Sequence, residues 1–72
     1  MARYNVNALK QLSVYLQGLS EGEKQKVKTA IQKYANDNNI DELRPADVEA
    51  GYYLNYKKYS EKEYANYCAS MD

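Results

Sequence analysis

The sequence has no histidine, phenylalanine or tryptophan, and it has one cysteine, one proline and three glycines. Histidine is the commonest general base and the commonest metal ligand in proteins, so its absence disfavours acid–base catalysis and transition-metal sites. Cys68 has no partner for an internal disulfide, which favours a reducing compartment and predicts a cytoplasmic protein. Familiar nucleotide-binding and hydrolase motifs are also missing. We therefore expect a protein that is not an enzyme and needs no cofactor or metal.

Net charge and long apolar runs are missing as well. Ten lysines and arginines balance ten aspartates and glutamates, so the total charge indicates no partner. The longest stretch without a charged residue, 11–20, is too short and too polar to cross a bilayer, and we expect neither a membrane partner nor a signal peptide. A chain of 72 residues predicts one domain, 1–72, with a small core.

Apolar residues recur throughout at spacings of three and four, which is typical of α-helices. The pattern predicts an all-α fold, a small four-helix bundle with short connections. The helices are expected at residues 5–18, 21–37, 45–59 and 61–71. Asn5 is a suitable cap for the first helix, and the second and fourth follow the capping boxes at 20–23 and 60–63.

Helix ends and connections are predicted from the remaining turn-forming residues. Gly18 and the Asn-rich run 36–39 are expected to end the first two helices. Residues 40–44 are expected to be a connector, and Pro45 suits the first position of the third helix.

Each helix has an apolar stripe that predicts its buried side. The stripes are Leu9, Leu12, Leu16 and Leu19 in the first helix, Val27, Ala30, Ile31 and Tyr34 in the second, and Tyr64, Tyr67, Cys68 and Met71 in the fourth. We expect Cys68 to be a small core side chain, because no histidine is present to activate it.

The third helix differs because it has two apolar sides. Val48, Tyr52, Tyr56 and Tyr59 form one side, and Ala46, Ala50, Tyr53 and Leu54 form the other. The second side is either an interface for another molecule or is covered by the fourth helix. Gly51, in the middle of this helix, predicts a close approach of a neighbouring helix.

All nine aromatic residues are tyrosines, whose large rings and polar hydroxyls suit protein interfaces. The leading hypothesis is a protein-binding module, an inhibitor or adaptor that occupies a surface of a larger protein partner. The predicted contact residues are Tyr53, Leu54, Tyr56, Lys57 and Tyr67. A length of 72 residues is also usual for phage or plasmid accessory proteins that block a host enzyme or defence system.

Two alternatives stay open. Residues 1–36 contain six basic and two acidic side chains, whereas the remainder contains four basic and eight acidic ones. The basic half favours a nucleic-acid-binding regulator that uses Lys24, Lys26, Lys28 and Lys33. A helix-turn-helix arrangement, with 45–59 as recognition helix, fits less well because Asp47 and Glu49 would lead into the groove. The opposite charges of the halves favour a self-assembling homo-oligomer.

Overall fold

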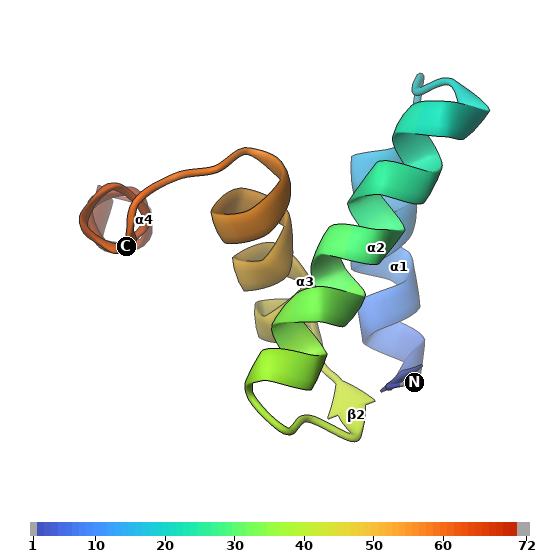
Figure 1. The fold of residues 1–72 in the computed structure, drawn as a ribbon, viewed down its shortest axis with the longest axis horizontal. Helices are drawn as coiled ribbons and strands as arrows, with labels where there is room; N and C mark the ends of the chain where they lie inside the picture. Colours follow the sequence, from blue (N-terminus) through green and yellow to red (C-terminus); the bar gives the residue numbers. More distant parts are fainter. Residues whose placement is uncertain (1, 71–72) are drawn as a thin grey trace.

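The computed structural model describes residues 2–70, most of which are helical (Figure 1). The helices are α1 (Val6–Leu16), α2 (Glu21–Asp37), α3 (Pro45–Gly51), the π-helix η1 (Tyr52–Tyr56) and α4 (Glu61–Ser70). Two short strands, β1 (Arg3–Tyr4) and β2 (Glu42–Leu43), complete the elements. The predicted all-α class is thus confirmed, with the addition of a minimal strand pair.

The helices begin at the predicted capping residues. The side chain of Asn5 accepts a hydrogen bond from the Ala8 amide at 2.7 Å, and Ser20 caps α2 in the same way. At the start of α4 both bonds of the capping box form: the Ser60 hydroxyl accepts from the Glu63 amide and the Glu63 carboxylate accepts from the Ser60 amide, each at 3.1 Å. These bonds satisfy amides that have no partner within the helix.

Two left-handed residues end the first two helices. Gly18 has φ +75°, directly after the last turn of α1. Asn39 has φ +55°, and the Asn38 side chain donates to the Tyr34 carbonyl. Glycine and asparagine tolerate this conformation better than other residues, so the residues predicted to stop the two helices are confirmed, although α1 itself ends at Leu16.

The predicted connector 40–44 contains a strand, which is a correction. β1 and β2 pair in parallel, with Arg3 opposite Glu42 and Tyr4 opposite Leu43. The pair joins the two ends of the chain segment that contains α1 and α2, and Leu43 of β2 is completely buried in the core. A two-residue strand is too short to show an alternating pattern, so its sequence carries no signal for it.

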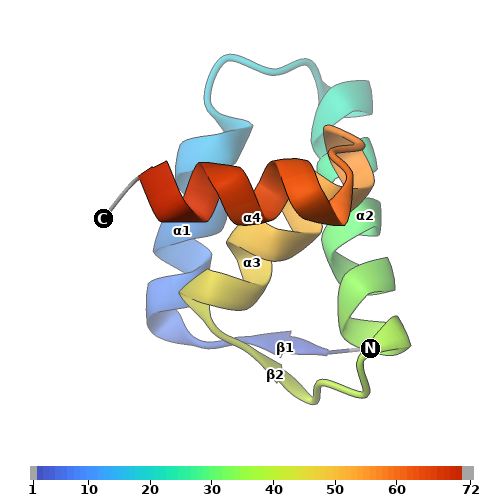
Figure 2. The same ribbon diagram turned by 90° about the vertical axis from the view of Figure 1, so that its left-hand side faces the viewer.

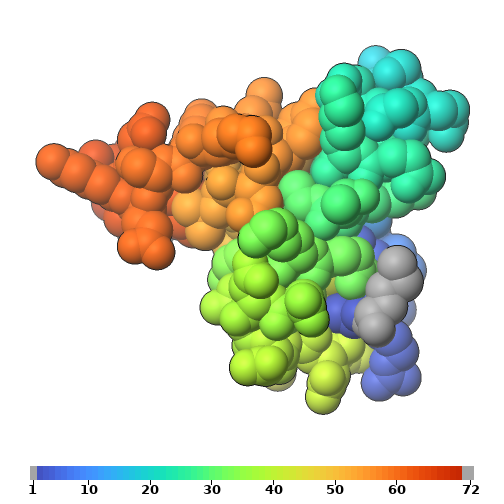
Figure 3. All heavy atoms as spheres, viewed as in Figure 1, coloured from blue at the N-terminus to red at the C-terminus, as the bar shows by residue number. Residues whose placement is uncertain are grey.

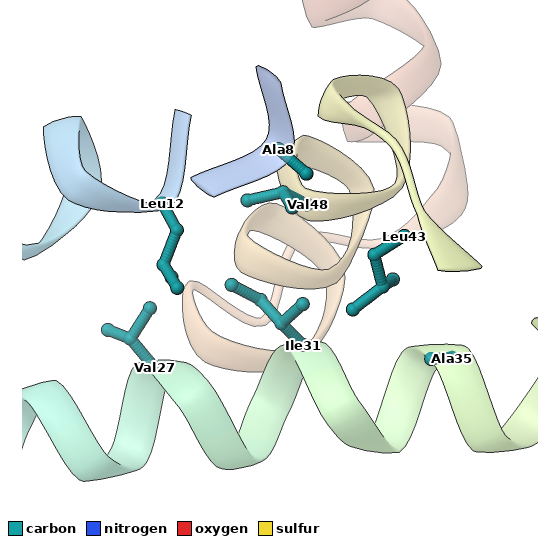
Figure 4. Close-up of a cluster of buried hydrophobic side chains, with 7 residues drawn as sticks. All are labelled: Ala8, Leu12, Val27, Ile31, Ala35, Leu43 and Val48. Carbon is teal, nitrogen blue, oxygen red and sulfur yellow. The ribbon is translucent and has the colours of Figure 1, made fainter. Parts of the chain in front are cut away.

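The core lies where α1, α2, α3 and β2 meet (Figure 4). It consists of Ala8, Leu12, Val27, Ile31, Ala35, Leu43 and Val48. The predicted stripe of α2 is confirmed, but that of α1 is wrong at one position, because Leu9 is 51% exposed while Ala8 is buried. The small Ala8 side chain faces Val48 and lets α1 and α3 approach closely.

The third predicted helix, 45–59, is shorter and changes type. α3 ends at Gly51, η1 continues to Tyr56, and Lys58 adopts a left-handed conformation with φ +60°. The first helix ends two residues earlier than predicted, and Met71, expected in the last helix, lies outside the described residues.

α3 lies between α1 and α2 and contacts both, whereas α4 projects from the body beside η1 (Figures 1 and 2). The space-filling view shows this projection clearly (Figure 3). No residue of α4 among those described is fully buried. The shared core is therefore built by three helices and the strand pair, and α4 attaches to it from the side.

Candidate binding site

Seven of the nine tyrosines form one cluster, which attaches η1 and α4 to the body. The members of this tyrosine cluster are Tyr15, Tyr52, Tyr53, Tyr56, Tyr59, Tyr64 and Tyr67. Tyr15 of α1 stacks on Tyr52 with parallel rings 4.1 Å apart. Offset and edge-to-face ring pairs are each worth roughly 0.5–1.5 kcal/mol beyond their buried area.

Tyr53 is the centre of this cluster. Its ring lies 4.6 Å from that of Tyr67 and 6.1 Å from that of Tyr64, both on α4. Its hydroxyl donates a hydrogen bond to the Tyr67 hydroxyl at 3.1 Å. The sequence leaves two alternatives for the second apolar side of the third helix, an interface for another molecule or cover by the fourth helix. At Tyr53 the structure shows that α4 covers this side. Tyr52 and Tyr53 do not lie in opposite environments, since both are half-buried and their rings are 5.1 Å apart.

The cluster raises the pKa values of several phenols above the ordinary value of about 10. The hydrogen bond to Tyr67 and burial raise the pKa of Tyr53 well above that value. Burial, the largest cause, also raises the pKa of Tyr64, and burial raises the pKa of Tyr15. Burial disfavours the charged phenolate, so these groups stay protonated and apolar in the folded protein.

We expect the protein to lose stability in alkali because of these raised pKa values. The tyrosines of the unfolded chain ionise at about pH 10, whereas those with a raised pKa in the folded chain ionise only at higher pH. The free energy of unfolding is therefore at its full value below about pH 10 and declines as the pH rises above it. Tyrosinate absorbance and far-ultraviolet circular dichroism, followed in one titration, should show late tyrosines ionising together with loss of helix. The same titration in guanidinium chloride is the control. Identical curves with and without denaturant would contradict the expectation.

Beside the tyrosine cluster, α2 and η1 enclose a groove of about 740 Å³, which we call the lysine groove. Four lysines from two distant parts of the chain line it: Lys26, Lys33, Lys57 and Lys58. Asn55 and Tyr56 line it as well, and the Asn55 side chain donates to the Ala30 carbonyl of α2 at 2.9 Å. This bond fixes η1 against α2.

One carboxylate balances part of the positive charge of the lysine groove. The Tyr56 hydroxyl donates to one oxygen of Glu23 at 2.6 Å, and the Lys26 ammonium lies 3.3 Å from the other. These two contacts lower the pKa of the Glu23 carboxyl, and the contact with Glu23 raises the pKa of Tyr56. With four lysines and one glutamate, the lining stays cationic at neutral pH.

Lys58 shows backbone strain at the edge of the groove. Its φ of +60° lies in the left-handed region, which costs an ordinary side chain roughly 1–2 kcal/mol. The turn is held by bonds from the Lys57 amide to the Tyr52 carbonyl and from the Tyr59 amide to the Tyr53 carbonyl. A glycine would fit here without strain, so the lysine carries a charge at the expense of stability.

The structure divides the four lysines of the nucleic-acid hypothesis into two pairs. Lys26 and Lys33 line the lysine groove, whereas Lys24 and Lys28 line a different groove on the other side of α2. Three of the four make ion pairs along the helix: Lys24 with Glu21, Lys26 with Glu23 and Lys33 with Asp37. Such exposed pairs contribute about 0–1 kcal/mol each and are easily exchanged for another anion.

The helix-turn-helix arrangement needs residues 45–59 as its recognition helix, whereas α3 spans only Pro45–Gly51. This helix contacts both α1 and α2, and Val48, Ala50 and Gly51 are buried, whereas Ala46 is exposed.

The predicted protein-binding residues have different surroundings. Tyr53 and Tyr67 contact each other inside the tyrosine cluster, and Leu54 is half-buried. Tyr56 and Lys57 line the lysine groove, and the Lys57 ammonium lies 5.8 Å from the centre of the Tyr52 ring. Lys58 and Asn55 were not predicted, because only the fold brings 55–58 beside α2.

One prediction about α4 is wrong. Cys68 is an exposed free thiol and not a core side chain. In α4, Tyr64 and Tyr67 are half-buried at the tyrosine cluster, whereas Cys68 lies on a side that is exposed among the residues that the structure describes.

No protein-family model matches the chain, and neither a curated protein nor a solved structure matches it. Within residues 2–70, no three potential metal ligands gather at one place. None of the helices in that range has the length and apolar character that a bilayer span requires.

Proposed function

We propose that the protein is a non-enzymatic binding module that occupies a surface of a larger protein, as an inhibitor or adaptor, and that the lysine groove is its contact site. The observation that supports this most directly is the convergence of two predicted contact residues, Tyr56 and Lys57, with Lys26 and Lys33 from α2. An accessory protein that blocks an enzyme of a host cell is one form of this function.

The lining predicts the chemistry of the partner surface. Four ammonium groups around one half-buried ring favour a patch rich in carboxylates with an apolar centre. The ion pairs of Lys26 and Lys33 are exposed and weak, so partner carboxylates can replace Glu23 and Asp37. The bond between Asn55 and Ala30 holds the groove in shape before binding, which lowers the entropic cost of association.

The test is affinity capture from the source cell with three forms of the chain. Wild type and a Lys62→Glu control should retain the same partner, because Lys62 is exposed on α4 and outside the groove. The double variant Lys57→Glu and Lys58→Glu should lose it. Equal capture by all three forms would show that the lysine groove is not the contact site.

Nucleic-acid binding is a second candidate for the same groove, because Lys57 and Lys58 enlarge the cationic surface that α2 provides. Four phosphate contacts on a single strand would make the logarithm of affinity fall with the logarithm of salt at a slope of roughly −3. Fluorescence anisotropy with labelled single-stranded oligonucleotides measures this slope. Strong binding with such a slope, lost in the double variant, would favour nucleic acid over protein.

A further inference from the structure

A second groove, which we call the leucine groove, lies between α1 and α2 and has a volume of about 740 Å³. Leu9, Leu12 and Leu16 of α1 form its apolar side, and Lys24 and Lys28 of α2 form its cationic side. It shares no lining residue with the lysine groove. The two grooves therefore lie on different sides of α2.

The leucine groove exists because no other helix or strand within residues 2–70 packs over this side of the α1 and α2 pair. α3 inserts between the two helices and takes most of their contacts, while α1 and α2 touch each other little (Figure 2). In a four-helix bundle the fourth helix would cover such a groove, but the tyrosine cluster holds α4 against η1. Leu9 is left 51% exposed as a result.

We propose that the leucine groove binds an amphipathic helix of a partner protein, one with an apolar stripe bordered by carboxylates along one edge. A groove between two helices accepts the ridge of a third, and leucines three and four residues apart match an apolar stripe at the same spacing. α1 has 11 residues and is thus roughly 16 Å long, enough for about three turns of a docked helix.

Charge complementarity determines the class of helix. Lys24 and Lys28 are one turn apart on the same wall, and among the described residues Lys28 makes no ion pair. Glu21 also lines the groove, beside Gly18 at the end where α1 and α2 connect, and it pairs with Lys24 at 3.3 Å. The carboxylates of the partner helix should therefore lie towards Lys28 and away from Glu21.

This surface goes beyond the proposed function, because that function needs only the lysine groove. Two grooves with separate linings would allow the protein to hold two partners at once. An adaptor requires this, whereas an inhibitor does not.

The experiment uses two synthetic amphipathic peptides of about 18 residues, a length that supports a helix in water. Both have leucines on one face, and they differ only in having glutamate or lysine along the edge of that face. Each is titrated into the isotopically labelled full chain, and amide chemical shifts locate the binding site. The glutamate peptide should shift the amides around Leu9, Ser13 and Lys28 and bind at least tenfold more tightly than the lysine peptide.

Matched variants test the lining. Leu9→Gln should weaken the glutamate peptide at least tenfold, whereas Val14→Gln should leave affinity unchanged, because Val14 is also exposed on α1 but does not line the groove. Lys28→Gln should weaken binding several-fold. Lys10→Gln should not, because Lys10 is also an exposed lysine but does not line the groove. The Lys57→Glu and Lys58→Glu variant should bind as wild type does, which separates this inference from the proposed function.

Four results of the peptide titrations would overturn the inference, and a fifth would come from the chain alone. They are the absence of shifts at millimolar peptide, equal affinity for the two peptides, shifts confined to the lysine groove, and equal losses in Leu9→Gln and Val14→Gln. Shifts at Leu9 that depend on protein concentration without any peptide would identify a second copy of this chain as the occupant and would also refute it.

Discussion

Ile31→Ala is expected to lower the free energy of unfolding by about 3–5 kcal/mol. Ile31 has no exposed surface and lies at the middle of α2, where Val27, Leu43 and Val48 surround it (Figure 4). Truncation removes apolar area and leaves a cavity, and both effects are unfavourable. Gly51 lies close to this residue, because a Cβ atom added there would be only 2.9 Å from the Ile31 Cα atom, so the surrounding atoms have little freedom to fill the space.

The size of this effect is large for so short a chain. At roughly 0.05–0.15 kcal/mol per residue, the whole domain has a stability of about 4–11 kcal/mol. The variant is therefore expected to be partly unfolded at room temperature if the stability of the wild type lies near the lower end of this range.

Urea unfolding followed by circular dichroism measures the difference in stability between wild type and Ile31→Ala, and Leu9→Ala is the control. Leu9 is 51% exposed, so its truncation should change stability by less than about 0.5 kcal/mol. Equal losses in both variants would contradict the core described above.

The helix starts could be predicted from the sequence because capping is local. Asn5, Ser20 and Ser60 each bond to an amide three residues later, so the whole signal lies within four consecutive residues. The stops at Gly18 and Asn39 are local in the same sense, since each depends on the conformational freedom of one residue.

The buried side of α1 could not be fixed by periodicity alone. Leu9 and Ala8 are adjacent, and a stripe through either position has helical spacing. α3 approaches on the Ala8 side because a small side chain there allows Val48 to pack closely, and Leu9 is turned outward. The choice between the two sides thus depends on a helix 40 residues away in the sequence.

The candidate site could be predicted only in part for a related reason. The tyrosines and lysines were recognisable by type, but their grouping depends on the end of α3. Tyr52 and Tyr53 in η1 both lie in the tyrosine cluster, with ring centres 5.1 Å apart, although the sequence pattern predicts two different sides for them. Lys57 and Lys58, which follow η1 in the chain, line one groove together with residues of α2.

Gly51→Ala is expected to destabilise the protein by about 2–3 kcal/mol, although alanine is the better helix former by about 1 kcal/mol. A Cβ atom at this position would lie 2.9 Å from the Cα atom of Ile31 and 3.2 Å from the Cβ atom of Tyr34. The nearest atom belongs to the backbone, so no side-chain rotation relieves the contact. α3 must move away from α2 as a whole.

The matched control is Gly22→Ala in the first turn of α2, where an added Cβ would meet nothing within 4 Å. This variant should gain roughly 0.5–1 kcal/mol, so the two substitutions should shift the urea midpoint in opposite directions. Equal shifts would show that α2 and α3 are not in close contact at Gly51.

Separation of α2 and α3 would also strain the hydrogen bond from Asn55 to Ala30, which fixes η1 and the lysine groove. In capture experiments under conditions in which both variants are still folded, Gly51→Ala should therefore lose the partner of the lysine groove. Gly22→Ala should retain it.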